Sequence, residues 1–92
     1  MTKSVLTRIE GKVQGVWYRN WTVENAKELG LNGWVRNRTD GSVEALFSGD
    51  AEIVDKMLKR CEDGPELARV TAVLVEISDA PTGVGLHKFP TV

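Results

Sequence analysis

Cysteine, histidine and long apolar segments are all scarce in this sequence. Cys61 is the one cysteine and His87 the one histidine among 92 residues. A single thiol cannot form an internal disulfide, so the sequence is typical of a protein from a reducing compartment, and we expect a cytoplasmic location. No apolar run approaches the length of a membrane-spanning helix, and the first residues lack the apolar core of a signal peptide. We therefore expect no disulfide scaffold and no membrane partner.

An excess of basic charge is absent as well. The chain has 12 Lys and Arg residues against 13 Asp and Glu residues, a formal net charge of −1. No basic block favours binding to a phosphate backbone, so we expect no nucleic-acid partner. The apolar share of 41% is enough for one hydrophobic core and too little for two, which predicts a single domain over residues 1–92.

Apolar periodicity predicts an alternation of strands and helices. Period-two patterns indicate strands over residues 5–13, 33–37, 42–47 and 68–77, and a weaker one over 85–89. Helical spacing of apolar residues indicates one helix over residues 18–29 and a second between Asp50, a good N-cap, and Gly64. Asp40-Gly41 is typical of a hairpin turn. This order predicts an α+β, ferredoxin-like split βαβ sandwich: βαββαβ plus a C-terminal strand, with two helices on one face of a mostly antiparallel sheet.

The stretch from Gly11 to Arg19 joins the first predicted strand to the first predicted helix. Backbone N–H groups between Gln14 and Arg19 would have no strand or helix partner and could point together at one anion. Gly15 can take a positive φ at little cost, and the arginine guanidinium matches two phosphate oxygens. The pattern is neither a Walker A motif nor Gly-x-Gly-x-x-Gly. A phosphate site and a plain strand-to-helix turn with a solvated arginine both fit the glycine spacing.

The predicted topology brings a second polar residue to this loop. A right-handed strand-helix-strand crossover returns the chain parallel to its first strand, so the carboxyl ends of the two strands share one edge of the sheet. Asn37 ends the second of these strands. We therefore expect Asn37 to lie close to the loop that carries Arg19.

These blocks of sequence together resemble the acylphosphatase family over nearly the whole chain. The resemblance is carried by Gly11-Lys-Val-Gln-Gly-Val-Trp-Tyr-Arg19, Ala26, Leu29-Gly30-Leu31, Gly33-Trp34-Val35-Arg36-Asn37, Asp40-Gly41-Ser42-Val43-Glu44, Gly49, Met57, Cys61 and Gly64-Pro65. It implies hydrolysis of the carboxyl-phosphate anhydride of acyl phosphates to a carboxylate and inorganic phosphate, with no metal and no organic cofactor. We expect such an enzyme to act as a monomer on a small-molecule substrate.

The resemblance also assigns roles to residues of this chain. The family's catalytic arginine falls on Arg19 and its catalytic asparagine on Asn37, which would orient the attacking water. Its phosphate-binding loop falls on Gln14, Gly15, Val16, Trp17 and Tyr18. In the family, the second position before the arginine is commonly Phe or Gly, and the position directly before it is commonly Phe. Here these positions are Trp17 and Tyr18. These larger rings could alter substrate entry or rate.

Other reactive or charged residues favour structural roles. His87 is expected at the surface or sheet edge, Cys61 in the core, and Asp40 and Glu44 in a turn and on a solvent-facing strand position. Trp34 is expected in the core, whereas Trp17 and Trp21 could serve packing or substrate contact. Arg36 and Arg38 suit either a solvated face or a positive field that attracts the substrate, with the solvated face favoured.

Two other classes of function share this order of elements. RNA-binding modules need exposed aromatic residues on the central strands, where this chain has Ile9, Val43 and Ala45. A module that binds a phosphate compound without turnover is the other alternative; acylphosphatase-like domains also occur at the start of a large hydrogenase maturation protein, which would need a long chain after Val92. Conversion of more than one equivalent of substrate would separate an enzyme from both.

Overall fold

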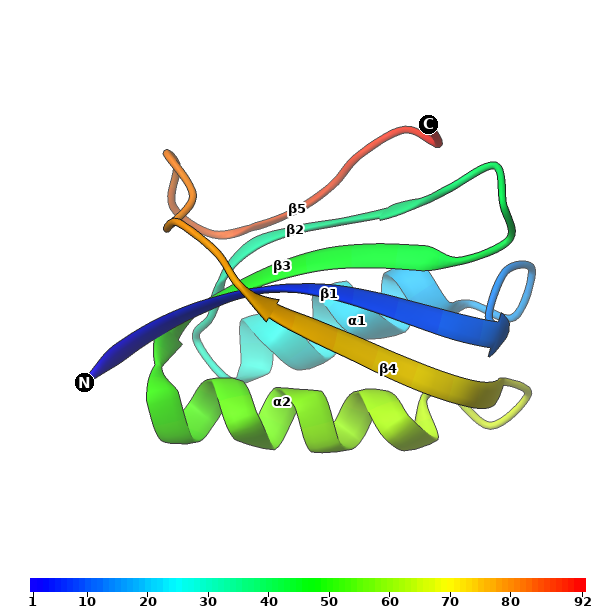
Figure 1. Cartoon of the computed structure of the whole chain (residues 1–92), viewed down its shortest axis with the longest axis horizontal. Coiled ribbons are helices and arrows are strands. Elements are labelled where there is room, and N and C mark those ends of the chain that lie inside the picture. Colours follow the sequence, from blue (N-terminus) through cyan, green and yellow to red (C-terminus); the bar gives the residue numbers. More distant parts are fainter.

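The computed structural model describes residues 1–92 as two layers, with two helices beneath a five-stranded sheet (Figure 1). The elements along the chain are β1 (Thr2–Lys12), α1 (Tyr18–Glu28), β2 (Asn32–Asn37), β3 (Val43–Asp50), α2 (Ala51–Asp63), β4 (Arg69–Ile77) and β5 (Leu86–Lys88). The predicted fold class and order of elements are confirmed. No helix has the length and apolarity needed to cross a membrane.

The sheet order is β4-β1-β3-β2-β5, and only the last pair of strands is parallel. Strand β3 lies between β1 and β2 and runs antiparallel to both. Strands β1 and β2 therefore point the same way, and their carboxyl ends lie at the same end of the sheet. In Figure 1 the loop after β1 and the hairpin after β2 lie together at one end of the molecule, as the crossover argument predicts.

The core lies between the sheet and the two helices. Val5, Ile9 and Phe47 are fully buried on the helix side of the sheet. The helices contribute the buried residues Tyr18, Thr22 and Ala26 from α1 and Val54, Met57 and Cys61 from α2. Burial of each large apolar side chain stabilises the fold by roughly 1.5–3 kcal/mol.

Cys61 is a core residue, as its position on the apolar stripe of α2 predicts. Burial raises the pKa of its thiol to about 12. The group therefore stays protonated at neutral pH and cannot act as a thiolate nucleophile. Its backbone carbonyl has a structural use, because it accepts a hydrogen bond of 2.6 Å from the hydroxyl of Tyr18.

The prediction that Trp34 lies in the core is wrong. Neighbouring residues on a strand face opposite sides, and the fully buried Val35 takes the helix side of β2. Trp34 is therefore on the outer face. Its ring stacks on that of Phe89, with 5.7 Å between the ring centroids, and the guanidinium carbon of Arg36 lies 4.7 Å from the centroid of the Trp34 ring. Glu44 also faces outward, but it is not solvated as expected: its side chain is only 14% exposed because Arg36 and Arg38 cover it.

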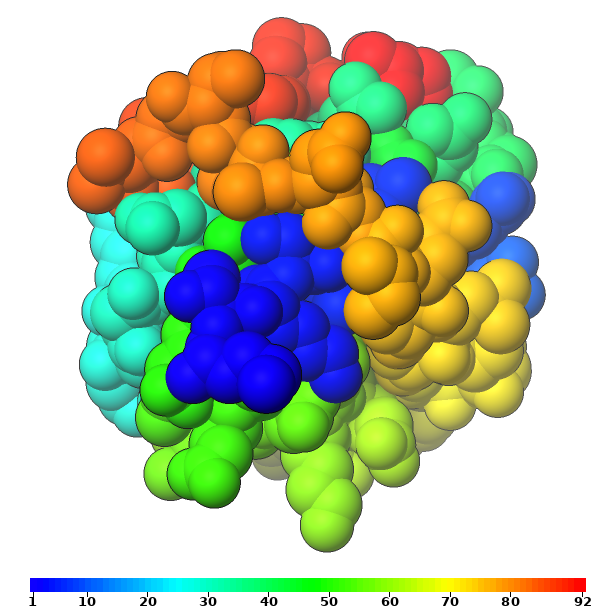
Figure 2. Space-filling view, turned by 60° about the vertical axis from the view of Figure 1, so that its left-hand side comes forward, coloured from blue at the N-terminus to red at the C-terminus, as the bar shows by residue number.

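The segment from Ser78 to Gly85 connects the two edges of the sheet. Figure 2 shows this segment, in orange, passing close to the amino end of β1, in blue. It leads from β4 at one edge to β5 at the other, so the last strand pairs with β2 and not with its sequence neighbour. As a result, residues near the C-terminus lie beside Asn37.

Candidate functional site

The five residues between β1 and α1 form a loop with unpaired amides. Gly15 has the predicted positive φ, at 73°. None of the backbone N–H groups of residues 14 to 20 donates a hydrogen bond within the chain, and the first helical bond runs from the N–H of Trp21 to the carbonyl of Trp17. A run of free donors at the positive end of a helix dipole is a site for an anion.

Trp17 has an unusual backbone conformation for its type. Its φ is 70°, the only positive value at a residue other than glycine. A left-handed conformation costs a bulky residue roughly 1–2 kcal/mol, and the exposed indole, 72% accessible, regains little of that cost through packing. The same conformation turns the chain abruptly into α1, so the loop amides are arranged at the expense of backbone strain.

Arg19 and Asn37 line the same pocket, which has a volume of about 300 Å³. The pocket is bounded by Val13, Gln14, Gly15, Trp17, Tyr18, Arg19, Asn20, Asn37 and Lys88. Asn37 therefore lies beside the loop that carries Arg19, as the predicted topology requires. Val16, which was also predicted for this loop, is buried and does not line the pocket. The side chain of Tyr18 is buried too, and its hydroxyl is bound to the carbonyl of Cys61.

Arg19 is the only arginine without a protein partner. Arg8, Arg36, Arg38 and Arg60 form ion pairs, and Arg69 donates to backbone carbonyls. A guanidinium with five donors and no acceptor in the chain is available to an external anion. Arg36 and Arg38 share the carboxylate of Glu44, which offsets one of their two positive charges.

Gln14 ties the loop to the hairpin that follows Asn37. Its side-chain amide donates to the carbonyls of Arg38 at 2.7 Å and Ser42 at 2.8 Å. The hairpin itself closes as predicted, because the Asp40 carboxylate accepts from the hydroxyl of Ser42 at 2.6 Å and from its N–H at 2.9 Å. These bonds hold the pKa of Asp40 below its usual value. The side chain of Gln14 therefore fixes the two loops relative to each other.

The C-terminal residues support Asn37 from the other side. Phe89 donates its N–H to the carbonyl of Val35 at 2.9 Å, and Val92 donates to the carbonyl of Asn37 at 3.1 Å. The carbonyl of Val92 in turn accepts from the N–H of Thr39 at 2.7 Å. The chain after β5 thus continues beside β2 and fixes the backbone that carries the asparagine.

Sequence reasoning missed Lys88 and Asn20 as pocket residues. Lys88 lies on β5 opposite Val35 of β2, and its ammonium donates to the side-chain oxygen of Asn20 at 3.0 Å. The signal that could have found it is the parallel pairing of β5 with β2, which no local pattern reveals. His87, the neighbouring residue, is exposed and lines no part of this pocket, consistent with its expected surface role.

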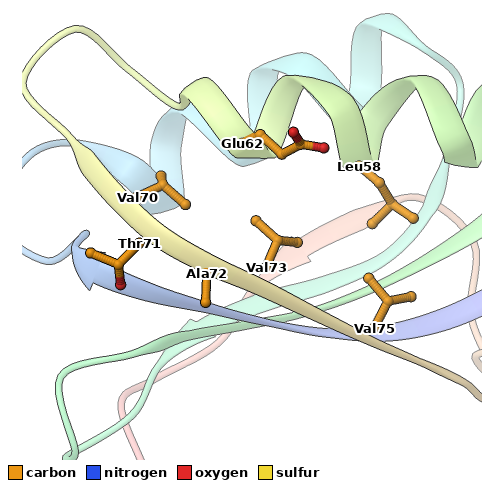
Figure 3. A pocket seen from close by; sticks show the side chains of 7 residues that line it. All are labelled: Leu58, Glu62, Val70, Thr71, Ala72, Val73 and Val75. Atoms are coloured by element: carbon orange, nitrogen blue, oxygen red, sulfur yellow. The ribbon is translucent and has the colours of Figure 1, made fainter.

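A larger depression of about 500 Å³ lies between α2 and β4. Figure 3 shows Leu58 and Glu62 on the helix above the valine side chains of the strand. Its lining is mostly apolar, and Glu62 is its only titratable residue. A site with one carboxylate and no basic side chain repels an anionic ligand, so the smaller pocket beside Arg19 is the candidate site.

Comparisons with known proteins identify the family of the chain. The family model described as Acylphosphatase matches residues 5–90. An acylphosphatase of Rhodospirillum rubrum is 56% identical over 90 residues, which cover 98% of this chain and 99% of the relative. One of Rhizorhabdus wittichii is 52% identical over 84 residues, covering 91% of this chain and 85% of the relative.

Solved structures give the same result for the fold. The structure of an acylphosphatase from Coxiella burnetii superimposes with a TM-score of 0.91 at 28% identity, over 96% of this chain and 93% of that one. An acylphosphatase from Bacillus subtilis gives a TM-score of 0.86 at 30% identity, over 96% and 97% of the two chains. The chain therefore belongs to the acylphosphatase family, whose members are hydrolases that act on acyl phosphates.

Proposed function

We propose that the loop after β1 binds the phosphate group of an acyl phosphate and that Asn37 orients the water that attacks it. The observation that carries this proposal is the row of unpaired N–H groups from residues 14 to 20 beside a guanidinium with no partner. The products are a carboxylate and inorganic phosphate.

The loop and Arg19 supply positive charge where phosphoryl transfer needs it. The transition state spreads negative charge over the oxygens of the transferred group, and catalysis consists mainly of positioning and electrostatic stabilisation. Backbone amides held by the fold and a planar guanidinium can bind these oxygens without reorganising. We assign phosphate binding to the main chain of Gln14, Gly15, Val16, Trp17 and Tyr18 and to Arg19, which also acts as a catalytic residue.

Asn37 is suited to hold a water molecule and not to deprotonate it. Its side-chain amide makes no hydrogen bond within the chain, and it can accept from a water and donate to a phosphate oxygen. A strong base is unnecessary because the leaving carboxylate is a weak base and a phosphate oxygen can take the proton. For the same reason we propose that the reaction needs neither a metal ion nor an organic cofactor.

The test is steady-state hydrolysis of benzoyl phosphate in a chelator, with the parent and variants of matched stability. Arg19→Ala should lower kcat/KM by at least about 100-fold, the usual effect of losing one contact to developing charge. Asn37→Ala should also lower kcat. Lys27→Ala, which removes an exposed positive charge from α1 outside the pocket, should leave both parameters unchanged. A folded Arg19→Ala protein with the parent rate would refute the assignment.

We also propose that residues 1–92 act as one domain, as a monomer, in the cytoplasm. Arg19 and Asn37, the two proposed catalytic residues, lie in one pocket of one chain, so the proposed mechanism uses no residue of a second copy. Light scattering at the concentration of the assay should give the mass of one chain. A kcat/KM that rises with protein concentration would contradict a monomeric enzyme.

A further inference from the structure

The pocket contains a second positive charge that the proposed phosphate site does not use. Lys88 reaches it from β5, on the far side of β2 from the phosphate loop. Its ammonium is held by the side-chain oxygen of Asn20, the residue that follows Arg19 in the first turn of α1. Two cations from different elements therefore line one small site.

No acidic side chain balances these two cations within the pocket. None of the lining residues is Asp or Glu, and neither Arg19 nor Lys88 forms an ion pair anywhere in the chain. The bond between Lys88 and Asn20 is to a neutral amide, so it orients the ammonium and leaves its charge uncompensated. In the proposed function the loop amides and Arg19 hold the phosphate, which leaves the charge of Lys88 available to a second negative group on the ligand.

The lining also offers little to an apolar acyl group. Val13 and Tyr18 are buried, and Trp17 is the only large apolar side chain exposed at the pocket. A volume of about 300 Å³ is at the lower end of the range for ligand sites, which still leaves room for more than the phosphate. The space beyond the phosphate is therefore bordered mainly by polar and positive groups.

We propose that Lys88 binds a carboxylate on the acyl group, so that the enzyme prefers acyl phosphates derived from dicarboxylic acids. This inference rests on the proposed function, in which the loop amides and Arg19 already satisfy the phosphate oxygens. Lys88 is exposed and lies on β5, whereas the phosphate loop follows β1, so in this proposal its ammonium faces the acyl end of the substrate. Lys88 is thus a specificity residue for the acyl group.

The experiment compares 4-carboxybenzoyl phosphate with 4-carbamoylbenzoyl phosphate, which differ by one charge at nearly equal size. The readout is the ratio of their kcat/KM values. The parent should favour the carboxylate by roughly fivefold to tenfold, the effect of one charge-assisted contact in a partly exposed site. Lys88→Met should bring the ratio close to one, Lys88→Arg should keep most of it, and added salt should reduce it in the parent.

Two controls separate this inference from its alternatives. Lys59→Met, which removes an exposed charge from α2 outside the pocket, should keep the parent ratio. Inhibition by inorganic phosphate should be equal in the parent and in Lys88→Met; a large loss of inhibition with an unchanged ratio would place Lys88 on the phosphate and overturn the proposal. A parent that hydrolyses both substrates equally well would overturn this inference alone. A parent that hydrolyses neither would overturn the proposed function with it.

Discussion

The two helices begin in opposite ways, although each follows a strand in the same split βαβ arrangement. At α2, the carboxylate of Asp50 accepts a hydrogen bond of 3.0 Å from the N–H of Glu52, whose own acidic side chain lies in the first turn. At α1, Trp17 offers no side-chain cap and the first turn contains no acidic residue. Arg19 lies there instead, and the amides of the loop remain unpaired.

This difference separates a structural helix end from one available to a ligand. The positive end of a helix dipole and its free N–H groups are stabilised by a carboxylate when the chain supplies one. At α2 the chain supplies it and gains stability. At α1 the chain supplies no carboxylate and gives up the stability of a cap, and this uncapped end is where we propose that the phosphate binds.

The largest expected effect follows from giving α1 an anion of its own. Asn20→Asp places a carboxylate of nearly the same shape in the first turn of α1. We expect kcat/KM for benzoyl phosphate to fall by about 100-fold, because the carboxylate pairs with Lys88, where the Asn20 oxygen now lies, and repels the phosphate in the same pocket. The free energy of unfolding should rise by about 0.5 kcal/mol through the helix dipole.

These opposite changes are measured by steady-state kinetics and by urea denaturation. Glu52→Gln, which removes the acid from the first turn of α2, is the matched control at the other helix. We expect it to lower the free energy of unfolding slightly and to leave kcat/KM unchanged. An Asn20→Asp enzyme that kept the parent kcat/KM would show that the start of α1 does not bind the phosphate.

A smaller effect, on stability alone, is expected at the start of α2. Asp50→Ala removes the cap and should lower the free energy of unfolding by about 1 kcal/mol. Asp50→Asn keeps an oxygen acceptor and should restore most of this loss. Asp50 pairs with Thr2 at the amino end of β1, and the pocket lies at the carboxyl end of that strand, so both variants should keep the parent kcat/KM. Chemical denaturation together with the benzoyl phosphate assay checks both statements; a matching loss of activity would refute the division between the two helix ends.

The smallest effect concerns the strain at Trp17. Trp17→Gly should raise the free energy of unfolding by about 0.5–1 kcal/mol relative to Trp17→Ala, because glycine takes a positive φ without the steric cost. The comparison with alanine cancels the loss of the indole, which is mostly exposed. Thermal melts of the two variants in the same buffer give the difference. Equal melting temperatures would mean that the loop is not strained at this position.

Local patterns in the sequence were sufficient for most of the fold. Asp50, Gly64 and the stripe of Val54, Met57 and Cys61 define α2 correctly, since capping and helical periodicity depend on neighbouring residues. The crossover rule also placed Asn37 beside the Arg19 loop, because it depends only on the order of elements. The catalytic roles of these two residues stay predictions.

The remaining features depend on contacts that no local pattern contains. Trp34 was misplaced because alternation leaves open which face of a strand is buried until the partner strands are known. Lys88 was missed because its position depends on the parallel pairing of β5 with β2, across a connection that spans the whole sheet. The left-handed conformation of Trp17 is imposed by the junction between β1 and α1, against the preference of the residue itself.

The course of the chain across the sheet also has a consequence for folding. Contacts within each helix and hairpin join residues close in sequence, whereas the bond between Lys88 and Asn20 joins residues 68 positions apart. Contacts over long separations carry the larger loop-closure cost and form more slowly. The pocket is therefore complete only after the Ser78–Gly85 segment has crossed the sheet and β5 has joined β2. In refolding experiments, helical signal should recover before discrimination between acyl groups does.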